Sequence, residues 1–210
     1  NGIELTFDKI RFRWDKGIVA EKVAFGRAQL VSGPELVMDQ VQMGINPEAL
    51  LHGRIAVNRL RLINGQLDWH FAGTNQPAAP LIVQKVNSDL HIYPGAVWEL
   101  KTFTAGFHGT EFSLSGTLSN ATSLADLWRG KTNAPAVETT DAMLRRFVQA
   151  MTNWQFTGKP VMEVQFKGDA VHLEGIQAEL RVRADQAHTP FGEFQQFALA
   201  AAMAPTNRSG

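Results

Sequence analysis

Histidine is the residue type in this chain that could most readily hold a metal ion. The six histidines are His52, His70, His91, His108, His172 and His188. No two of them stand two or four residues apart, so the sequence contains no local pair of the kind that binds a metal on a strand or a helix. We therefore expect the histidines to lie on strand faces or at the surface, and we expect no metal and no other cofactor.

The residues that serve as nucleophiles and general bases are not arranged in a catalytic motif. There is no cysteine, which excludes thiol nucleophiles, disulfides and cysteine-ligated metals. The segment nearest to a nucleophile elbow, Ser113-Leu114-Ser115-Gly116, lacks the first glycine of that motif. No glycine-rich phosphate loop is present, and the carboxylates are scattered singly. We predict that the protein is not an enzyme; a hydrolase would need carboxylates or histidines that converge from distant segments.

Charge and composition exclude two further classes of protein. The 210 residues include 20 basic and 20 acidic side chains, so the net charge is zero and the basic surface of a general nucleic-acid binder is missing. Arg11 and Arg13 alternate with Phe12 and Trp14, a pattern that we interpret as a half-buried strand with a charged outer face. A charged content of only 19% excludes a disordered chain of the charge-driven kind.

The apolar residues of the N-terminal segment follow the two-residue period of β-strands. Apolar residues alternate at Ile3, Leu5 and Phe7, and again at Ile10, Phe12 and Trp14, with a phase shift across Asp8-Lys9. The same shift occurs across Asp39-Gln40 and across Asn58-Arg59. An extra residue in a strand produces such a shift by a bulge or a bend. The recurrence suggests neighbouring strands that bend at a comparable level, although short alternating segments can also show it by chance.

Turn signals divide the remainder of the chain into further strands. The most specific signal is Asn64-Gly65, which predicts a two-residue hairpin between the strand ending near Leu62 and the strand 66–71. We expect largely antiparallel pairing. The other expected strands cover residues 18–30, 81–93, 97–107, 110–118, 160–167, 171–183 and 194–201.

Two segments have the pattern of helices. Asn46 and Pro47 are typical of a helix start, and Gly53 is typical of its end, which predicts a single turn between strands. The second helix, 141–153, has an apolar stripe and is predicted to pack on the sheet, with a lid or a membrane-surface helix as the alternatives. Its stripe consists of Met143, Leu144, Phe147, Val148 and Met151, with Trp154 directly after them. We expect a curved sheet over 1–118, a loop-rich connection over 119–139, and a helix with three further strands over 140–203 that continues the sheet.

One stretch resembles a known family. The segments Leu36-Val37-Met38-Asp39-Gln40-Val41-Gln42-Met43, Asn46-Pro47-Glu48-Ala49-Leu50-Leu51-His52-Gly53 and Ile55-Ala56-Val57-Asn58-Arg59-Leu60-Arg61-Leu62 follow one another with only short spacers. This order of strand, short Leu-Leu-x-Gly turn and strand resembles the AsmA-like family of bacterial envelope proteins, relatives of TamB and YhdP. The resemblance covers roughly residues 3–70, and its motif is structural, so it carries over no catalytic residues.

The resemblance implies a fold and a function. The expected fold is mainly β (α+β): a long, strongly curved, trough-like antiparallel sheet with the helix near 141–153 packed against it. The implied function is a non-catalytic envelope module on the periplasmic side of a bacterial cell. It would guide phospholipid acyl chains or support outer-membrane biogenesis, with an anchoring segment absent from this chain. The expected lipid-contacting residues are Phe7, Phe12, Met38, Met43, Val57, Leu62, Trp69, Phe71, Trp98, Phe103 and Phe107.

Other partners and functions stay open. Exposed sheet edges could pair with flanking parts of a longer chain or with another copy, and no nucleic acid is expected. The alternative function is a structural or adhesive β-domain that binds protein or glycan at the cell surface. A trough with unfilled apolar surface would favour lipid handling, whereas a closed core with aromatic residues on a rim would favour adhesion.

Overall fold

The computed structural model describes residues 4–26, 33–71, 81–123, 145, 148, 154–172, 175–189 and 192–204. These residues form a mainly β protein, as the sequence predicted, with an open sheet of predominantly antiparallel strands in the order β1-β3-β4-β5-β6-β7-β8-β10-β11-β12. Two further strands lie beside this path, β2 on β3 and β9 on β11. The chain divides into two compact units, residues 1–92 with 100–107 (unit 1) and residues 93–99 with 108–210 (unit 2).

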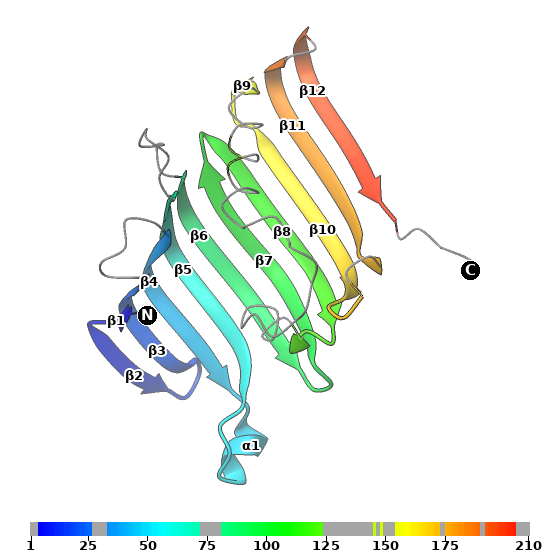
Figure 1. The fold of residues 1–210 in the computed structure, drawn as a ribbon. Helices are drawn as coiled ribbons and strands as arrows, with labels where there is room; N and C mark the ends of the chain where they lie inside the picture. The colour runs from blue at the N-terminus through cyan, green and yellow to red at the C-terminus, as the bar shows by residue number, and fades with distance from the viewer. Residues whose placement is uncertain are drawn as a thin grey trace. The chain divides into compact units, whose positions relative to one another are not determined.

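The strands of unit 1 follow one another along the chain and pair with their neighbours (Figure 1). Those that lie wholly or almost wholly in this unit are β1 (Glu4–Thr6), β2 (Lys9–Arg13), β3 (Gly17–Gly26), β4 (Gly33–Ile45), β5 (Val57–His70) and β6 (Leu81–Tyr93). The pairings among these six strands are antiparallel. β7 (Val97–Phe107) contributes its second part to this unit.

The short helix α1 (Pro47–Leu51) lies between β4 and β5, where the sequence predicted a single turn. Asn46 caps it, because its side-chain oxygen accepts hydrogen bonds from the backbone N–H groups of Glu48 (2.9 Å) and Ala49 (3.3 Å). Pro47 occupies the first helical turn, where its missing N–H costs no hydrogen bond. Gly53 ends the turn with a positive φ of 67°.

A line of irregular positions crosses the strands of unit 1 at one level. Lys22 has a φ of 54° and Asn64 a φ of 48°, both in the left-handed region and both inside strands. The pairing of β3 with β4 passes over Lys22 and Asp39, and the pairing of β4 with β5 passes over Asp39 and Asn64. The phase shift predicted at Asp39-Gln40 therefore belongs to a bend shared by neighbouring strands.

The break between β1 and β2 lies at the same level. Thr6 pairs with Ala24 and Lys9 pairs with Glu21, so the shift predicted across Asp8-Lys9 faces Lys22. The shift predicted at Asn58-Arg59 is also present, as a register shift opposite Gly44 and Ile45, but it lies at a different level of the sheet.

Side chains bind one another along this line. The Lys22 ammonium donates to Asp39 at 3.0 Å, and the Asn64 amide donates to the other carboxylate oxygen of Asp39. The Asn64 backbone N–H donates to the Asn87 side chain at 2.9 Å. We call Lys22, Asp39, Asn64 and Asn87 the bend row. These bonds lower the pKa of Asp39, chiefly through the amide of Asn64 and then through Lys22.

The predicted hairpin at Asn64-Gly65 is wrong. Both residues lie inside β5, which runs without interruption from Val57 to His70. Asn64 uses its tolerance of the left-handed region for a bend within the strand instead of for a chain reversal. Gly65 leaves room for the buried Met38 side chain, because a Cβ at this position would lie 2.2 Å from the Met38 sulfur and would displace it.

Unit 2 contains β8 (Thr110–Ser119), β9 (Gln155–Thr157), β10 (Val161–Asp169), β11 (Gln177–Thr189) and β12 (Gly192–Met203). β10 pairs with β8 in parallel and with β11 in antiparallel fashion, so the meander expected from sequence is broken at one point. The expected strand 171–183 is also wrong in its first residues, because β11 begins at Gln177. Turn-like backbone hydrogen bonds precede it, from His172 to Asp169 and from Gly175 to His172.

The helix expected over 141–153 lies largely outside the described residues. Of its members, Arg145 and Val148 are described; both are helical and half-buried. The expected connection 119–139 and the division at 140 likewise fall mostly outside the described residues and stay predictions. No helix in the described part of the chain has the length and apolar character needed to cross a membrane.

The left-handed conformation of Asn64 generates a stability prediction. We expect Asn64→Val to lower the free energy of unfolding by about 2 kcal/mol, because a β-branched residue is strained at positive φ and cannot bind Asp39. Asn64→Gly is the matched control: it loses the same hydrogen bond but not the backbone conformation, and it should cost less. Urea denaturation of both variants measures the difference. Equal losses would show that the φ of 48° is not what selects asparagine.

Candidate functional site

One face of the unit 1 sheet is made of apolar side chains. Residues directly opposite one another in an antiparallel ladder point to the same side of the sheet, so the register assigns them to faces. Val23 lies opposite Met38, and Met38 lies opposite Gly65. The apolar face defined in this way consists of Leu5, Ile10, Phe12, Ile18, Ala20, Val23, Phe25, Leu36, Met38, Val41, Met43, Leu60, Leu62, Leu67, Trp69, Leu81, Val83, Val86 and Leu90.

The opposite face of the same strands is polar. Lys9, Glu21 and Gln40 follow one another across β2, β3 and β4. Arg61 and Asp89 lie opposite one another on β5 and β6, as do Arg59 and His91. The ion pair of Arg11 with Glu21, at 3.0 Å, belongs to this face. The charged side chains of these strands therefore gather on this face, which also carries a few apolar residues such as Val19 and Val37.

The bend row allows this separation to continue along bent strands. Ala20 precedes Lys22 by an even number of residues, and Val23 follows it by an odd number, yet both belong to one buried cluster with Met38. A regular strand would place Ala20 and Val23 on opposite sides. The left-handed residue shifts the phase and keeps both on the apolar face.

Burial on the apolar face falls from its centre to one edge. Met38 is 2% exposed at the centre, whereas Phe12 is 49% and Leu5 is 57% exposed near β1 and β2. Within the described part of unit 1, the elements that pack together are neighbouring strands, and no helix or second sheet covers this face. The outer part of the face is consequently apolar surface in contact with solvent.

The expected lipid-contacting residues divide between the two units. Six of them lie on or beside the apolar face of unit 1 by register: Phe12, Met38, Met43, Val57, Leu62 and Trp69. Phe7 lies in the break between β1 and β2, and Phe71 directly follows β5. Phe103 and Phe107 lie in the part of β7 that belongs to unit 1, whereas Trp98 belongs to unit 2. Of the expected lid residues, Val148 alone is described.

Unit 2 has the same two-faced construction. Met162, Val164 and Phe166 of β10 share a face with Phe112 and Leu114 of β8. The face continues onto β11 and β12 with Leu180, Val182, Leu199, Ala201 and Met203. The register of β11 with β12 passes over Asp185 and Gln196, and Gln196 has a φ of 56°. A second phase shift therefore occurs in this unit.

Aromatic side chains gather where β9 joins this face. Trp154 and Phe197 pack edge to face with ring centres 5.9 Å apart, and Phe194 packs against Phe197 at 5.8 Å. Phe156 completes the group at 6.1 Å from Phe197. The sequence pattern assigned Trp154 to the stripe of the helix 141–153, but Trp154 is not helical and directly precedes β9. The spacing of Phe194 and Phe197 across two glutamines repeats the phase-shift pattern.

An ion pair with two hydrogen bonds lies on the polar face of unit 1. Arg59 binds Asp89 with two nitrogens, with Nε 2.7 Å from Oδ1 and Nη2 on Oδ2. His91 Nε2 lies 3.3 Å and Arg61 Nε 3.8 Å from the same carboxylate. The hydrogen bond from Arg59 lowers the pKa of Asp89 despite its partial burial. The carboxylate is thus suited to ion pairing and poorly suited to accept a proton near neutral pH.

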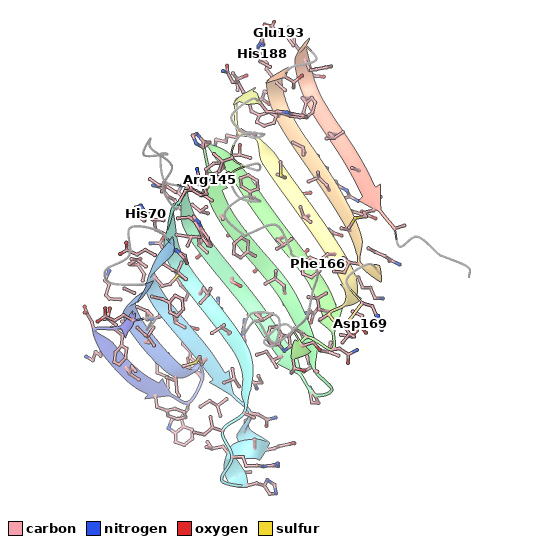
Figure 2. The ribbon with its side chains drawn as sticks, viewed as in Figure 1. His70, Arg145, Phe166, Asp169, His188 and Glu193 are labelled. Carbon is pink, nitrogen blue, oxygen red and sulfur yellow. The ribbon has the colours of Figure 1, made fainter. Side chains whose placement is uncertain are left out.

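Two smaller polar groups lie in unit 2 (Figure 2). Asp169 accepts hydrogen bonds from the Val171 backbone (2.8 Å), the Asn120 amide (2.7 Å) and the Ser119 hydroxyl (3.1 Å). The bond from Val171 is the largest cause of its lowered pKa. At the turn between β11 and β12, His188 Nδ1 lies 3.2 Å from Glu193 in an open hollow of about 470 Å³. In the described residues no three His, Asp or Glu side chains are grouped to hold a metal ion.

The sequence contains only a weak signal for the polar cluster around Asp89. Arg59-x-Arg61 on one strand and Asp89-x-His91 on the next alternate with apolar residues, so each pair belongs to a polar face. Which positive residue meets which negative residue depends on the register of β5 with β6, and a hairpin at Asn64-Gly65 does not lead to the observed pairing of Arg61 with Asp89.

Comparison with protein-family models, with curated proteins and with solved structures finds no match to this chain.

The Arg59–Asp89 pair generates a pH prediction. Because folding lowers the pKa of Asp89 below its ordinary value of 3.8, ionised Asp89 stabilises the folded state. This stabilisation is complete above the ordinary pKa and is lost as the pH falls through the folded pKa. We expect Asp89→Asn to lower the free energy of unfolding by about 1 kcal/mol at pH 7, and the difference from wild type to shrink below pH 4.

Chemical denaturation at a series of pH values measures this effect. Asp15→Asn is the control, because Asp15 makes only an exposed 3.8 Å contact with Arg13. A difference for Asp89→Asn that does not change between neutral and acid pH would contradict an electrostatic origin.

Proposed function

We propose that this chain is a non-catalytic module that holds apolar chains, such as phospholipid acyl chains, on the apolar face of its sheet. The observation that supports the proposal is the continuous apolar face of unit 1, which no described element of that unit covers. An apolar surface of this extent is unfavourable in water unless a partner or ligand covers it. An acyl chain gains about 0.8 kcal/mol for each methylene that it buries, without needing any polar partner.

The dimensions of the face suit such a ligand. The apolar residues extend over β2, β3, β4, β5 and β6, and four strand spacings of about 4.8 Å give a width of about 19 Å. The hydrocarbon part of one membrane leaflet, which one acyl chain spans, is about 15 Å thick. A chain lying across the strands would follow apolar residues, and it would contact them directly toward β1 and β2, where they are exposed, because Met38 and Val86 are closed to solvent.

The resemblance to AsmA-like proteins supports the same proposal from a different direction. It implies an envelope protein on the periplasmic side that takes part in lipid transport or outer-membrane biogenesis. The residues that carry the resemblance, Leu36–Met43 and Ile55–Leu62, contribute Met38, Met43 and Leu62 to the apolar face. The family and the location are part of the proposal.

A second candidate is a structural β-domain that pairs through its edge. β12 contains no charged residue from Phe194 to Met203 and no proline, and every residue of the strand except Phe197 is exposed. The other end of the strand order is protected, because β1 and β2 are short, interrupted and rich in charge. A strand of another copy or of a flanking segment could extend the sheet at β12.

Uptake of a fluorescent fatty acid by the purified protein tests the lipid proposal. We expect Phe12→Glu and Phe25→Glu, both on the exposed part of the apolar face, to weaken uptake by at least about tenfold. Thr6→Glu is the matched control, because Thr6 is exposed on the polar face of β1 and the variant adds the same charge. Circular dichroism confirms that the three variants fold alike.

Mass spectrometry of an organic extract shows whether lipid accompanies the purified protein. A phospholipid or fatty acid in near-stoichiometric amount supports the proposal. A protein without lipid that also takes up no fatty acid would contradict it, and pairing through β12 would become the leading candidate.

A further inference from the structure

The most exposed large apolar side chains of the described residues gather at one end of unit 1. Trp14 is 90%, Leu51 is 86% and Ile55 is 76% exposed, whereas no other large apolar side chain in the described residues exceeds 58%. Trp14 lies in the turn between β2 and β3. Leu51 and Ile55 belong to α1 and the residues that follow it, between β4 and β5. We call these three residues, with Arg13, Lys16 and Arg54, the tip.

The register places the two parts of the tip at the same end of the strands. Ile18, just after the first turn, lies opposite Met43, just before α1. Gly17 packs so closely on β4 that a Cβ there would lie 2.1 Å from the Met43 carbonyl oxygen. The Asn46 N–H donates to the Ala56 carbonyl at 2.8 Å and closes the base of the α1 segment. Figure 1 shows α1 projecting beyond the ends of β4 and β5.

The α1 segment is ordered by its own backbone and buries none of its side chains. Arg54 N–H donates to the Ala49 carbonyl and Gly53 N–H donates to the Leu50 carbonyl, both at 2.9 Å. No residue of α1 is buried. The backbone of this segment therefore keeps Leu51 and Ile55 exposed to water. This exposure is energetically unfavourable, and burial in a nonpolar environment would remove the cost.

We propose that the tip inserts into the surface of a lipid bilayer. Tryptophan favours the headgroup level of a membrane, and aliphatic side chains beside it enter the acyl region. Residues 13–16 and 46–55 carry three basic and two acidic side chains, so attraction to anionic lipid is weak and apolar insertion is the main source of affinity. This proposal rests on the proposed function and extends it, because the tip would be the part of the module that contacts the membrane.

The tip is continuous with the apolar face. The ring of Trp14 packs edge to face on Phe12, with ring centres 5.1 Å apart, and Phe12 belongs to the apolar face. Met43 and Leu60, at the same end of β4 and β5, lie opposite one another on that face. An acyl chain that leaves the bilayer at Trp14 would therefore meet apolar side chains without crossing a charged surface.

Flotation of the full chain with vesicles tests the tip. With vesicles of phosphatidylcholine and phosphatidylglycerol in roughly equal amounts, we expect Leu51→Glu with Ile55→Glu to lower the partition coefficient at least about tenfold. Val171→Glu with Met203→Glu is the matched control, because these side chains in unit 2 are also exposed, at 55% and 58%. Lys16→Ala should lower binding by no more than about fivefold, and only with anionic vesicles.

A second measurement reports the position of Trp14 directly. Phosphatidylcholine brominated in its acyl chains should quench part of the tryptophan fluorescence, and Trp14→Phe should remove that quenched part. The tip proposal is overturned if wild type binds no vesicles, or if the tip variant and the control variant float equally. It is also overturned if the tip variant changes the mass of the protein in solution instead, because the tip would then bind a second copy.

The outcome for the tip is separate from the outcome for the proposed function. Leu51→Glu with Ile55→Glu should still take up a soluble fluorescent fatty acid, because neither residue lies on the apolar face. Loss of vesicle binding with retained uptake supports both proposals. Vesicle binding through the tip by a wild-type protein that takes up no fatty acid supports the tip and contradicts the acyl-chain function.

Discussion

The structure of unit 1 depends on keeping apolar side chains on one side of strands that bend. In a strand whose apolar and polar residues alternate regularly, a single irregular position moves all later apolar residues to the other face of the sheet. The bend row prevents this by changing the phase of neighbouring strands at the same level, with left-handed residues at Lys22 and Asn64. Asp39 joins the two by accepting from both side chains. Without this coordination the apolar face would end at the bend.

The phase shifts were the most informative feature of the sequence. They located the break before Lys9 and the irregularity at Asp39, and the periodicity also gave β6 and β7 with their observed ends. The hairpin at Asn64-Gly65 failed for a physical reason: the left-handed preference of asparagine is the same in a tight turn and in a bend within a strand. A tight turn and a bend differ only in how the flanking residues pair with other strands. That pairing involves residues far away in the sequence, so the local pattern does not reveal it.

The parallel pairing of β8 with β10 was not predictable for a similar reason. Each strand has an ordinary alternating pattern, and nothing in Thr110–Ser119 or Val161–Asp169 indicates the direction of its neighbour. The candidate site was likewise predictable only in part. Alternation placed Phe12, Met38 and Leu62 on a common face, but it could not indicate how much of that face a second layer covers. Whether Trp14 or Leu51 is exposed depends on what packs against it. The order of apolar and polar residues in the sequence does not contain that information.

The separation of the two faces has a consequence for selectivity. Arg59 and Arg61, which could bind a phosphate group, point away from the side on which Met43 and Leu60 lie. One layer of backbone stands between them, so a lipid whose tail rests on the apolar side cannot present its headgroup to those arginines. If the proposed function holds, Arg59 and Arg61 would take no part in choosing the lipid, and any recognition of a headgroup would have to come from residues at the ends of the strands.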